Sequence, residues 1–199
     1  MTDTALLLTA LCLPMFAAAG ITLTSRWPNL RETVTLLSSA LLSITVFTIY
    51  LRFSDGAVFA LDIAEPLPGV MLRFEIESLG MLLALVTSTL WFVTGIYAIG
   101  YMRKHDEKNQ TRFYALFAIA IGSALGAAFA GNLLTLFLWY EILTLSTYPL
   151  VAHAGTKKAR RGARTYVGIL LTTSILFQLF AILITYSVAG TLDFREGGI

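Results

Sequence analysis

Long apolar runs divide the sequence, and charged residues occur almost only between them. Residues 4–25, 33–51, 78–102 and 165–192 contain no Asp, Glu, Lys or Arg, and each run reaches the roughly 20 residues that a membrane-spanning helix needs. The run 113–156 contains one charge. As a single helix it would be about 66 Å long, twice the roughly 30 Å of a bilayer core, so it must fold back.

Gly131 and Asn132 are the residues of a tight turn, and they divide this run into helices over 113–130 and 133–152. The pattern therefore predicts an all-α integral membrane protein with about six transmembrane helices, in a single membrane domain over 1–199.

In the loop 52–77, residues 70–76 alternate between apolar and polar side chains, which is typical of a half-buried strand. We expect a small extracytoplasmic hairpin at 57–76; the alternative is an ordered loop without strands.

Composition agrees with the membrane prediction. Hydrophobic residues make up 57% of the chain and charged residues 13%, whereas soluble domains carry about 25% charged residues. A net charge of +2 gives no reason to expect a nucleic-acid partner. A single cysteine, Cys12, excludes a disulfide framework or a Cys-based metal site within this chain. No phosphate-binding loop is present. We expect no cofactor and no metal.

Basic residues are strongly biased to one side of the predicted helices. Three of the fourteen fall on the side of the termini, and the other eleven fall on the opposite side: Arg26, Arg31, Arg103, Lys104, Lys108, Arg112, Lys157, Lys158, Arg160, Arg161 and Arg164. The positive-inside rule then predicts a multi-pass protein of the cell inner (plasma) membrane with both termini extracytoplasmic. The start has Asp3 instead of a basic segment, so we expect the first helix to remain uncleaved.

Glu141 is the one acid that falls in the middle of a predicted helix. A charge near the bilayer midplane costs roughly 2.5–3.5 kcal/mol even on lenient scales, and acids kept there are usually functional. Thr144 and Tyr148 share its helical face. We therefore predict that Glu141 is a proton-relay carboxylate. The alternative is that it joins neighbouring helices by a hydrogen bond without handling protons.

Other polar residues are candidates for a supporting role. Ser174 and Gln178 lie, with Thr185, on one stripe of the sixth helix, and His153 lies at the end of the helix of Glu141. A histidine can exchange protons near neutral pH, although an interfacial anchor is the alternative for His153. All fourteen Lys and Arg residues lie outside the predicted helices, so this chain offers Glu141 no counter-ion in the membrane.

Two further patterns concern packing and lipid. Gly122 and Gly126 have the spacing that lets helices approach closely. The basic cluster at 157–161 is typical of a cytoplasmic anchor, and binding to lipid head groups is the alternative. We therefore expect membrane lipid among the partners of this chain.

The segment around Glu141 resembles a known family. Residues 131–150 read GNLLTLFLWYEILTLSTYPL and resemble the fifth-helix signature of the antiporter-like membrane subunits. Such subunits occur in Mrp-type cation/proton antiporters, where they are the D subunit. They also occur in the proton-pumping arm of respiratory complex I. Residues 155–166, GTKKARRGARTY, resemble the family's link into helix six. Residues 74–80, FEIESLG, resemble its entry into helix three, although the family often has Asp where Glu77 stands.

The resemblance implies a role for Glu141 and a set of partners. In the family the matching glutamate pairs with a lysine on helix seven, and the pair gates proton movement. That lysine has no counterpart in this sequence, so we expect the N-terminal portion of a longer antiporter-like subunit. The resemblance implies cation/proton antiport or redox-linked proton pumping within a multi-subunit complex, with other membrane subunits, protons and Na+ or K+ as partners.

Two other function classes remain open. The first is a non-transporting assembly or structural membrane subunit in which Glu141 is only interhelical glue. The second is an oxidoreductase subunit that holds quinone or haem; it is the weakest, because a bis-histidine haem needs two ligands from facing helices, and His105 lies in a predicted loop. We expect no independent catalysis. The resemblance also admits a membrane subunit of an NADH:quinone oxidoreductase-type translocase.

Overall fold

The chain forms six long helical segments. The computed structural model describes residues 2–66 and 68–195. Its helices are α1 (Asp3–Leu23), α2 (Pro28–Ser54), α3 (Ser78–Lys104), α4 (Gln110–Ala128), α5 (Leu133–Val151), α6 (Lys157–Thr173) and α7 (Phe180–Ala189). A π-helical segment, Ser174–Leu179, joins α6 to α7 in one continuous span. All six segments are long and apolar enough to cross a bilayer. This confirms the predicted multi-pass, all-α membrane fold.

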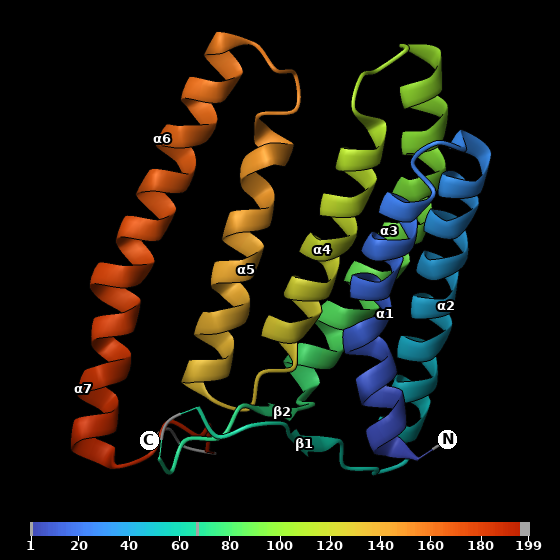
Figure 1. Cartoon of the computed structure of the whole chain (residues 1–199). Helices are drawn as coiled ribbons and strands as arrows, with labels where there is room; N and C mark the ends of the chain where they lie inside the picture. Colours follow the sequence, from blue (N-terminus) through green and yellow to red (C-terminus); the bar gives the residue numbers. More distant parts are fainter. Residues whose placement is uncertain (1, 67, 196–199) are drawn as a thin grey trace.

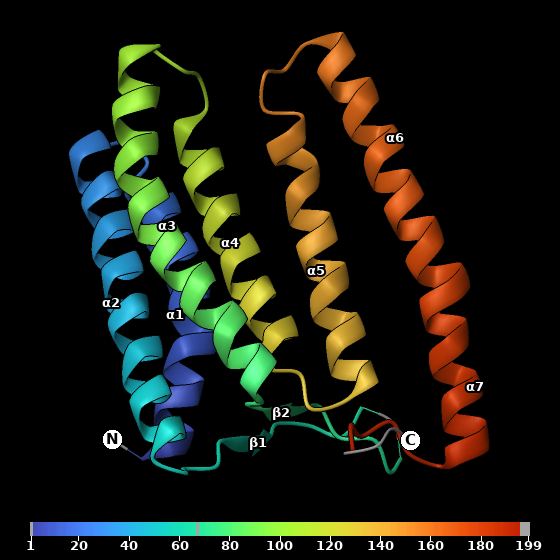
Figure 2. The same cartoon turned by 180° about the vertical axis from the view of Figure 1, so that it is seen from behind.

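The two ends of the helical bundle differ in character. The start of α1, the turn between α4 and α5 and the end of α7 lie at one end, together with a small hairpin (Figures 1 and 2). The hairpin consists of β1 (Ala60–Asp62) and β2 (Arg73–Glu75), which pair antiparallel with Leu61 opposite Phe74. The predicted hairpin at 57–76 is confirmed, with shorter strands than expected. Most of the basic residues lie at the opposite end, in its loops and in the adjoining helix turns.

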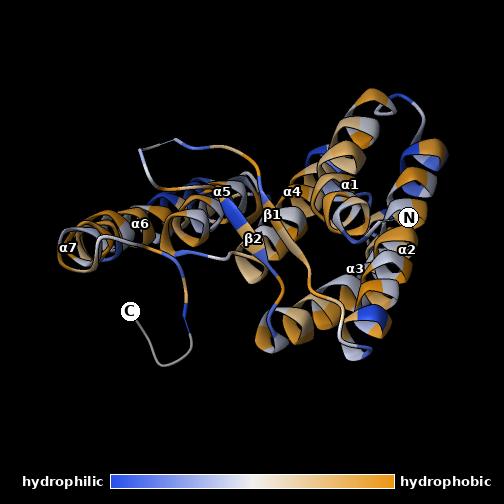
Figure 3. Ribbon diagram, turned by 90° about the horizontal axis from the view of Figure 1, so that it is seen from below, coloured by the Kyte–Doolittle hydropathy of each residue, from blue (hydrophilic) through white to orange (hydrophobic). Residues whose placement is uncertain are grey.

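Helices α1 to α4 form the packed core. Leu7, Ala10, Leu42, Ala84 and Ala118 are each fully buried there. Helix α5 packs against α4 on one side and α6 on the other, so the span of α6 and α7 is outermost (Figure 1). Apolar residues predominate along this outer span (Figure 3), and only 17% of it is buried, against 44% for α1. The rest of the bundle therefore leaves most of the surface of the outer span uncovered.

Close helix approach depends on the predicted glycines. A Cβ on Gly122 would lie 2.8 Å from Met15 Cε, and a Cβ on Gly126 would overlap the Trp139 ring. Helix α4 thus packs closely against both α1 and α5. The packing role predicted from the Gly122 and Gly126 spacing is confirmed.

Several helix boundaries differ from the predicted ones. Helix α6 begins at Lys157 instead of 165, because the Thr156 hydroxyl accepts from the Ala159 N–H at 3.1 Å and caps a helix that contains the basic cluster. Helix α2 begins at Pro28 instead of 33, and it includes Arg31 and Glu32. The expectation that all Lys and Arg residues lie outside the helices was therefore wrong, since charged residues extend the helix ends beyond the apolar runs.

The sixth span is also less regular than the pattern predicted. The stripe of Ser174, Gln178 and Thr185 assumed continuous α-helical periodicity, but residues 174–179 are π-helical. A π-helical turn contains more residues than an α-helical turn, so the phase of the stripe shifts between Ser174 and Thr185. Ser174 is buried, whereas Gln178 and Thr185 are only partly buried.

The approach of α3 to the end of α4 generates a stability prediction. A Cβ on Gly80 would overlap the Ala128 carbonyl oxygen, which is backbone, whereas one on Gly100 of the same helix meets nothing within 4 Å. We expect Gly80→Ala to lower the free energy of unfolding by about 1–3 kcal/mol and Gly100→Ala to be neutral or slightly stabilising. Thermal unfolding in detergent measures both, and equal stability of the two variants would contradict the packing described here.

Candidate functional site around Glu141

The start of α5 is held by backbone hydrogen bonds on two sides. From β2, the Glu75 N–H donates to the Phe129 carbonyl at 2.8 Å, and the Arg73 carbonyl accepts from the Gly131 N–H at 2.8 Å. From the segment after α7, the Leu192 carbonyl accepts from the Leu133 N–H at 3.0 Å. We call residues 129–133 with these two flanking segments the α5 clamp. It fixes where α5 begins and therefore how deep its residues lie.

Asn132 is the central side chain of the α5 clamp. It is fully buried, its Oδ1 accepts from the Thr135 N–H at 2.8 Å, and its Nδ2 donates to the Met71 carbonyl at 2.6 Å. The first contact caps α5, and the second joins the cap to the hairpin. Asn132 was predicted only as a turn residue; that it also joins two segments follows from tertiary structure.

Arg73 joins three segments at this end electrostatically. Its guanidinium lies 3.6 Å from Asp62 on β1, 3.8 Å from Glu75 on β2 and 3.6 Å from Asp193 after α7. These side chains are each about 40% exposed, so every single pair is worth little. Together they favour one arrangement of the hairpin against the C-terminal segment.

The direction of Glu141 follows from its neighbours on α5. Trp139 packs on Gly126 of α4 and makes an edge contact with Phe74 at 6.0 Å between ring centroids. Two residues further along a helix is a rotation of about 200°, so Glu141 points away from α4. Phe137, four residues before Glu141 and on nearly the same face, packs with Leu179 and Ile182 of the outer span. Glu141 therefore lies on the face of α5 that meets the outer span.

The carboxyl group of Glu141 is incompletely satisfied. Glu141 is half-buried, and its Oε1 is buried without a hydrogen-bond partner in the described part of the chain. Buried polar oxygens normally have a partner, and leaving one without costs about 1–3 kcal/mol. In a membrane helix such an atom is a candidate site for an exchanging proton or a group from another protein.

The π-helical segment lies level with Glu141. Phe137 belongs to the same hydrophobic cluster as Ile182, against which Leu179 packs, and Glu141 is about 6 Å further along α5. The outer span runs antiparallel to α5 (Figure 1). An equal distance along the outer span, in the same direction, leads from Leu179 and Ile182 back to Ser174 to Gln178. Helix α5 contacts this segment. π-Helical turns occur frequently at functional sites. The structure thus brings the candidates Ser174 and Gln178 to the level of Glu141, although the Ser174 hydroxyl donates to the Leu171 carbonyl.

The other candidates spread along α5 and beyond it. Thr144 is buried on the Glu141 face, and Tyr148 is half-buried about 10 Å from Glu141 along the axis. His153 lies beyond the end of α5, roughly 18 Å along the axis from Glu141. Its ring makes an edge contact with Phe113, and both ring nitrogens are buried with no hydrogen-bond partner among the described residues. His153 is therefore not brought to Glu141.

A polar cluster at the loop end was missed by the sequence analysis. Arg31 and Glu32 are both about 5% exposed and lie 3.5 Å apart. Glu32 also accepts two hydrogen bonds from Arg103, and Arg31 donates to Gln110 at 2.7 Å. The cluster ties the ends of α2, α3 and α4 together. Glu32 was expected in a loop; Pro28, a residue favoured at the first helical position, was the signal for an earlier start.

Comparison with known proteins supports the family predicted from the sequence. Residues 130–197 match the family described as NADH:quinone oxidoreductase/Mrp antiporter, transmembrane. Over this segment the chain is similar to the antiporter-like membrane subunits. The L subunit of NADH-quinone oxidoreductase from Escherichia coli K12 is 30% identical to it over 61% of this chain and 19% of the relative. The D subunit of the Na(+)/H(+) antiporter from Alkalihalophilus pseudofirmus is 31% identical over 46% of this chain and 18% of the relative.

Solved structures share the fold of this antiporter-like chain. A chain of the Mrp complex from Dietzia sp. DQ12-45-1b matches with a TM-score of 0.81 and 23% identity, over 97% of this chain and 36% of that one. A chain of the membrane-bound sulfane sulfur reductase, an archaeal respiratory membrane complex, matches with a TM-score of 0.79 and 20% identity, over 96% of this chain and 29% of that one. This antiporter-like chain therefore spans about a third of the structures it matches, and about a fifth of its sequence relatives is aligned.

The α5 clamp generates a prediction about Asn132. We expect Asn132→Ala to lower the free energy of unfolding by about 2 kcal/mol, because it removes a helix cap and leaves the Met71 carbonyl without its donor. Thr156→Ala removes the exposed cap of α6 and should cost about 0.5 kcal/mol. Thermal unfolding compares the two variants, and hydrogen exchange at 130–135 should accelerate only in Asn132→Ala. Unchanged exchange there would show that the clamp does not depend on Asn132.

Proposed function

We propose that this chain is the N-terminal portion of a proton-translocating, antiporter-like membrane subunit, and that Glu141 relays protons near the middle of the bilayer. The observation that carries the proposal is the Glu141 Oε1, a buried acid oxygen in mid-span that has no hydrogen-bond partner among the described residues. It lies on the α5 face that meets the outer span. The family match over 130–197 includes this residue.

The surroundings of Glu141 support a proton step over a static hydrogen bond. If Glu141 were only interhelical glue, its carboxyl would be expected to bond a neighbouring helix within the described bundle. The outer span, which that face of α5 meets, instead has a π-helical turn at that level, and α5 is among the least buried helices, at 22%. Weakly packed membrane segments rearrange more easily than a core. A hydrogen-bonding partner for the Glu141 carboxyl group can therefore approach it, and the helices around it can move to make room for that partner.

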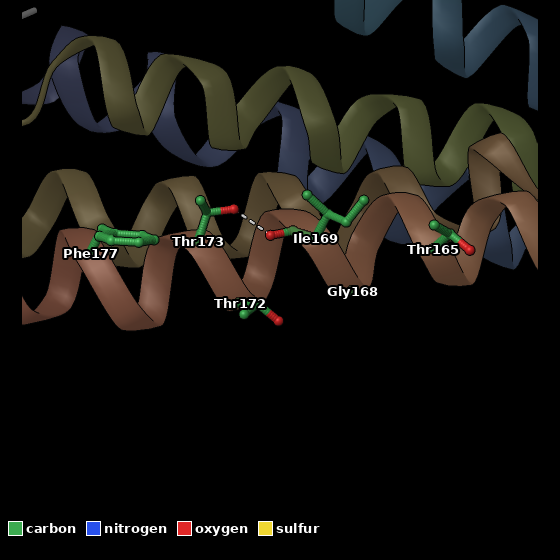
Figure 4. Close-up of a pocket in the computed structure, with 6 residues that line it drawn as sticks. All are labelled: Thr165, Gly168, Ile169, Thr172, Thr173 and Phe177. Carbon is green, nitrogen blue, oxygen red and sulfur yellow. Dashed lines mark hydrogen bonds between the residues drawn. The ribbon is translucent and has the colours of Figure 1, made fainter.

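We infer that this partner comes from further membrane protein, in the same subunit or in others of a multi-subunit complex. Figure 4 shows the residues that line a groove on α6 and the start of the π-helical segment. The volume of this groove is about 360 Å³. Its lining is Thr165, Gly168, Ile169, Thr172, Thr173 and Phe177. The Thr173 hydroxyl donates to the Ile169 carbonyl, so it is satisfied within its own helix. Small residues at this spacing permit close approach along α6.

We propose monovalent cation/proton antiport or redox-linked proton pumping as the activity of the whole assembly. The relatives are named as Na(+)/H(+) antiporter and NADH-quinone oxidoreductase subunits, so both activities remain candidates. Protons are common to the two, and Na+ or K+ belongs to the first. The chain would act in the plasma membrane with both termini extracytoplasmic.

The orientation generates a labelling prediction. In a Cys12→Ser background, Glu65→Cys at the hairpin end should react with a membrane-impermeant thiol reagent added to intact cells, whereas Lys158→Cys should react only after the membrane is opened. Both positions are exposed. The expected asymmetry follows from the basic residues at the Lys158 end. Labelling of the cysteine at 158 alone in intact cells would reverse the topology.

The role of Glu141 is tested by substitutions in the assembled complex. Glu141→Gln keeps the shape and removes the proton-exchanging group, so we expect coupled transport to fall by at least about 100-fold, the lower range for one proton-transfer group, at normal subunit levels. Glu141→Asp retracts the acid by one methylene and should retain part of the rate. The measurement is collapse of the pH gradient on cation addition in everted vesicles, or proton pumping on NADH addition.

Matched variants separate the proton relay from interhelical glue. Asp55→Asn makes the same chemical change at an exposed position outside the apolar spans and should leave transport unchanged. Under the glue alternative, Glu141→Gln would transport normally, whereas Glu141→Ala would lose assembly because partner groups are left unpaired. Wild-type transport by Glu141→Gln at equal protein would remove the case for a proton relay.

A further inference from the structure

A second cavity lies at the end of the bundle opposite the hairpin. It has a volume of about 360 Å³ and is enclosed by the starts of α4 and α6 and the last turn of α5. Arg112 reaches it from α4, Arg160 and Arg164 from α6, and Tyr148 and Pro149 from α5. Glu141 does not line this cavity, and binding of a ligand here requires no proton transfer by Glu141.

The charge of this cavity is unbalanced. Three arginines line it and no acid does, and none of the three has an ion pair with a carboxylate in residues 2–66 and 68–195. Arg112 donates to the His153 carbonyl at 3.5 Å, which leaves most of its donors free. In contrast, Arg31, Arg73 and Arg103 each lie against at least one carboxylate. Three guanidinium groups around one cavity favour an anion that accepts several hydrogen bonds at once.

The uncharged lining supplies further donors. Asn109 lines the cavity in the left-handed conformation, with φ of 59°, and its side chain makes no cap hydrogen bond to α4. Its amide is therefore available, as is the Tyr148 hydroxyl. The N-terminus of α4 adds a favourable dipole for an anion. Tetrahedral phosphate oxygens match this combination of guanidinium, amide and hydroxyl donors.

The position of the cavity selects a membrane lipid as the source of the phosphate. Helix α6 leaves the cavity at Arg164 and enters the apolar span, and Gly168, four residues on and therefore on nearly the same face, opens the groove of Figure 4. A Cβ on Gly168 would meet nothing within 4 Å, and Ile169 beside it is 63% exposed. An acyl chain can follow this apolar groove while its phosphate stays between the arginines. Inorganic phosphate would use the cavity and leave the groove unused.

We propose that the cavity of Arg112, Arg160 and Arg164 is a binding site for the phosphate head group of an anionic phospholipid, with an acyl chain lying over Gly168. Basic pockets between membrane helices are a known physical solution for such head groups. The basic segment 157–164 then has two parts. Arg160 and Arg164 bind one lipid specifically, whereas Lys158 and Arg161 do not line the cavity and contribute only to general attraction.

The test measures lipid retention by the protein purified in detergent with its co-purifying subunits. Phosphatidylglycerol is added and bound lipid is counted by native mass spectrometry, with phosphatidylcholine as the zwitterionic comparison. The double variant Arg160→Gln, Arg164→Gln should weaken phosphatidylglycerol retention about tenfold or more, because it removes charge-assisted hydrogen bonds to the phosphate. Lys158→Gln, Arg161→Gln removes the same charge from the same helix and should weaken it less than about threefold, because these exposed side chains do not line the cavity.

Three outcomes would overturn the proposal. The first is an equal loss of lipid retention in both double variants, which would indicate a diffuse basic surface. The second is unchanged lipid retention in Arg160→Gln, Arg164→Gln. The third is displacement of the lipid by millimolar inorganic phosphate, which would make free phosphate the ligand. Arg112→Gln, on α4, is the second variant if the α6 pair fails to fold, and it should weaken retention severalfold. Thermal unfolding of each variant shows that the fold is intact.

Discussion

The fold depends on how a long apolar stretch reverses direction where the backbone has little access to water. Between Ala128 and Leu133 the chain leaves one spanning helix and enters the next, and every N–H and C=O exposed by such a turn needs a partner. Strand β2 supplies partners on one side and the segment after α7 on the other. The turn therefore lies between β2 and the segment after α7 and is joined to each by an isolated β-bridge. The hairpin and the segment after α7 are needed because the backbone N–H and C=O groups of this turn must have hydrogen-bond partners.

That constraint determines the depth of Glu141. Asn132 caps α5 from within the α5 clamp. The position of the first residue of α5 is therefore fixed, and so is the position of each later residue along the helix axis. Trp139, packed into the space left by Gly126, fixes the rotation of the helix. Depth and rotation together direct Glu141 toward the outer span at the level of its π-helical turn. A proposed proton relay is thus positioned by backbone hydrogen bonds far from its own carboxyl group.

The bundle also divides into a firm part and a weakly packed part. Helices α1 to α4 share a continuous core, and α2, α3 and α4 are joined at their loop ends by Arg31, Glu32, Arg103 and Gln110. Glu32 is buried there and accepts hydrogen bonds from Arg103 of α3. Helix α5 and the span of α6 and α7 have smaller buried shares. The unsatisfied Glu141 oxygen and the π-helical turn belong to this second part, and the arginine cavity lies between it and the start of α4.

The sequence by itself determined the features that solvent and bilayer thickness impose. Apolar runs of spanning length predicted six helices, Gly131 and Asn132 marked the reversal, and alternation over 70–76 predicted the hairpin, because each of these is a local consequence of burying apolar groups and pairing backbone groups. Glu141 was identified because a mid-span acid is costly anywhere. Tertiary structure alone decided the rest. The burial of Glu32 with Arg31, the π-helical turn at Ser174, the separation of His153 from Glu141 and the meeting of Arg112 with Arg160 depend on contacts between residues distant in sequence, and no local pattern of polarity contains that information.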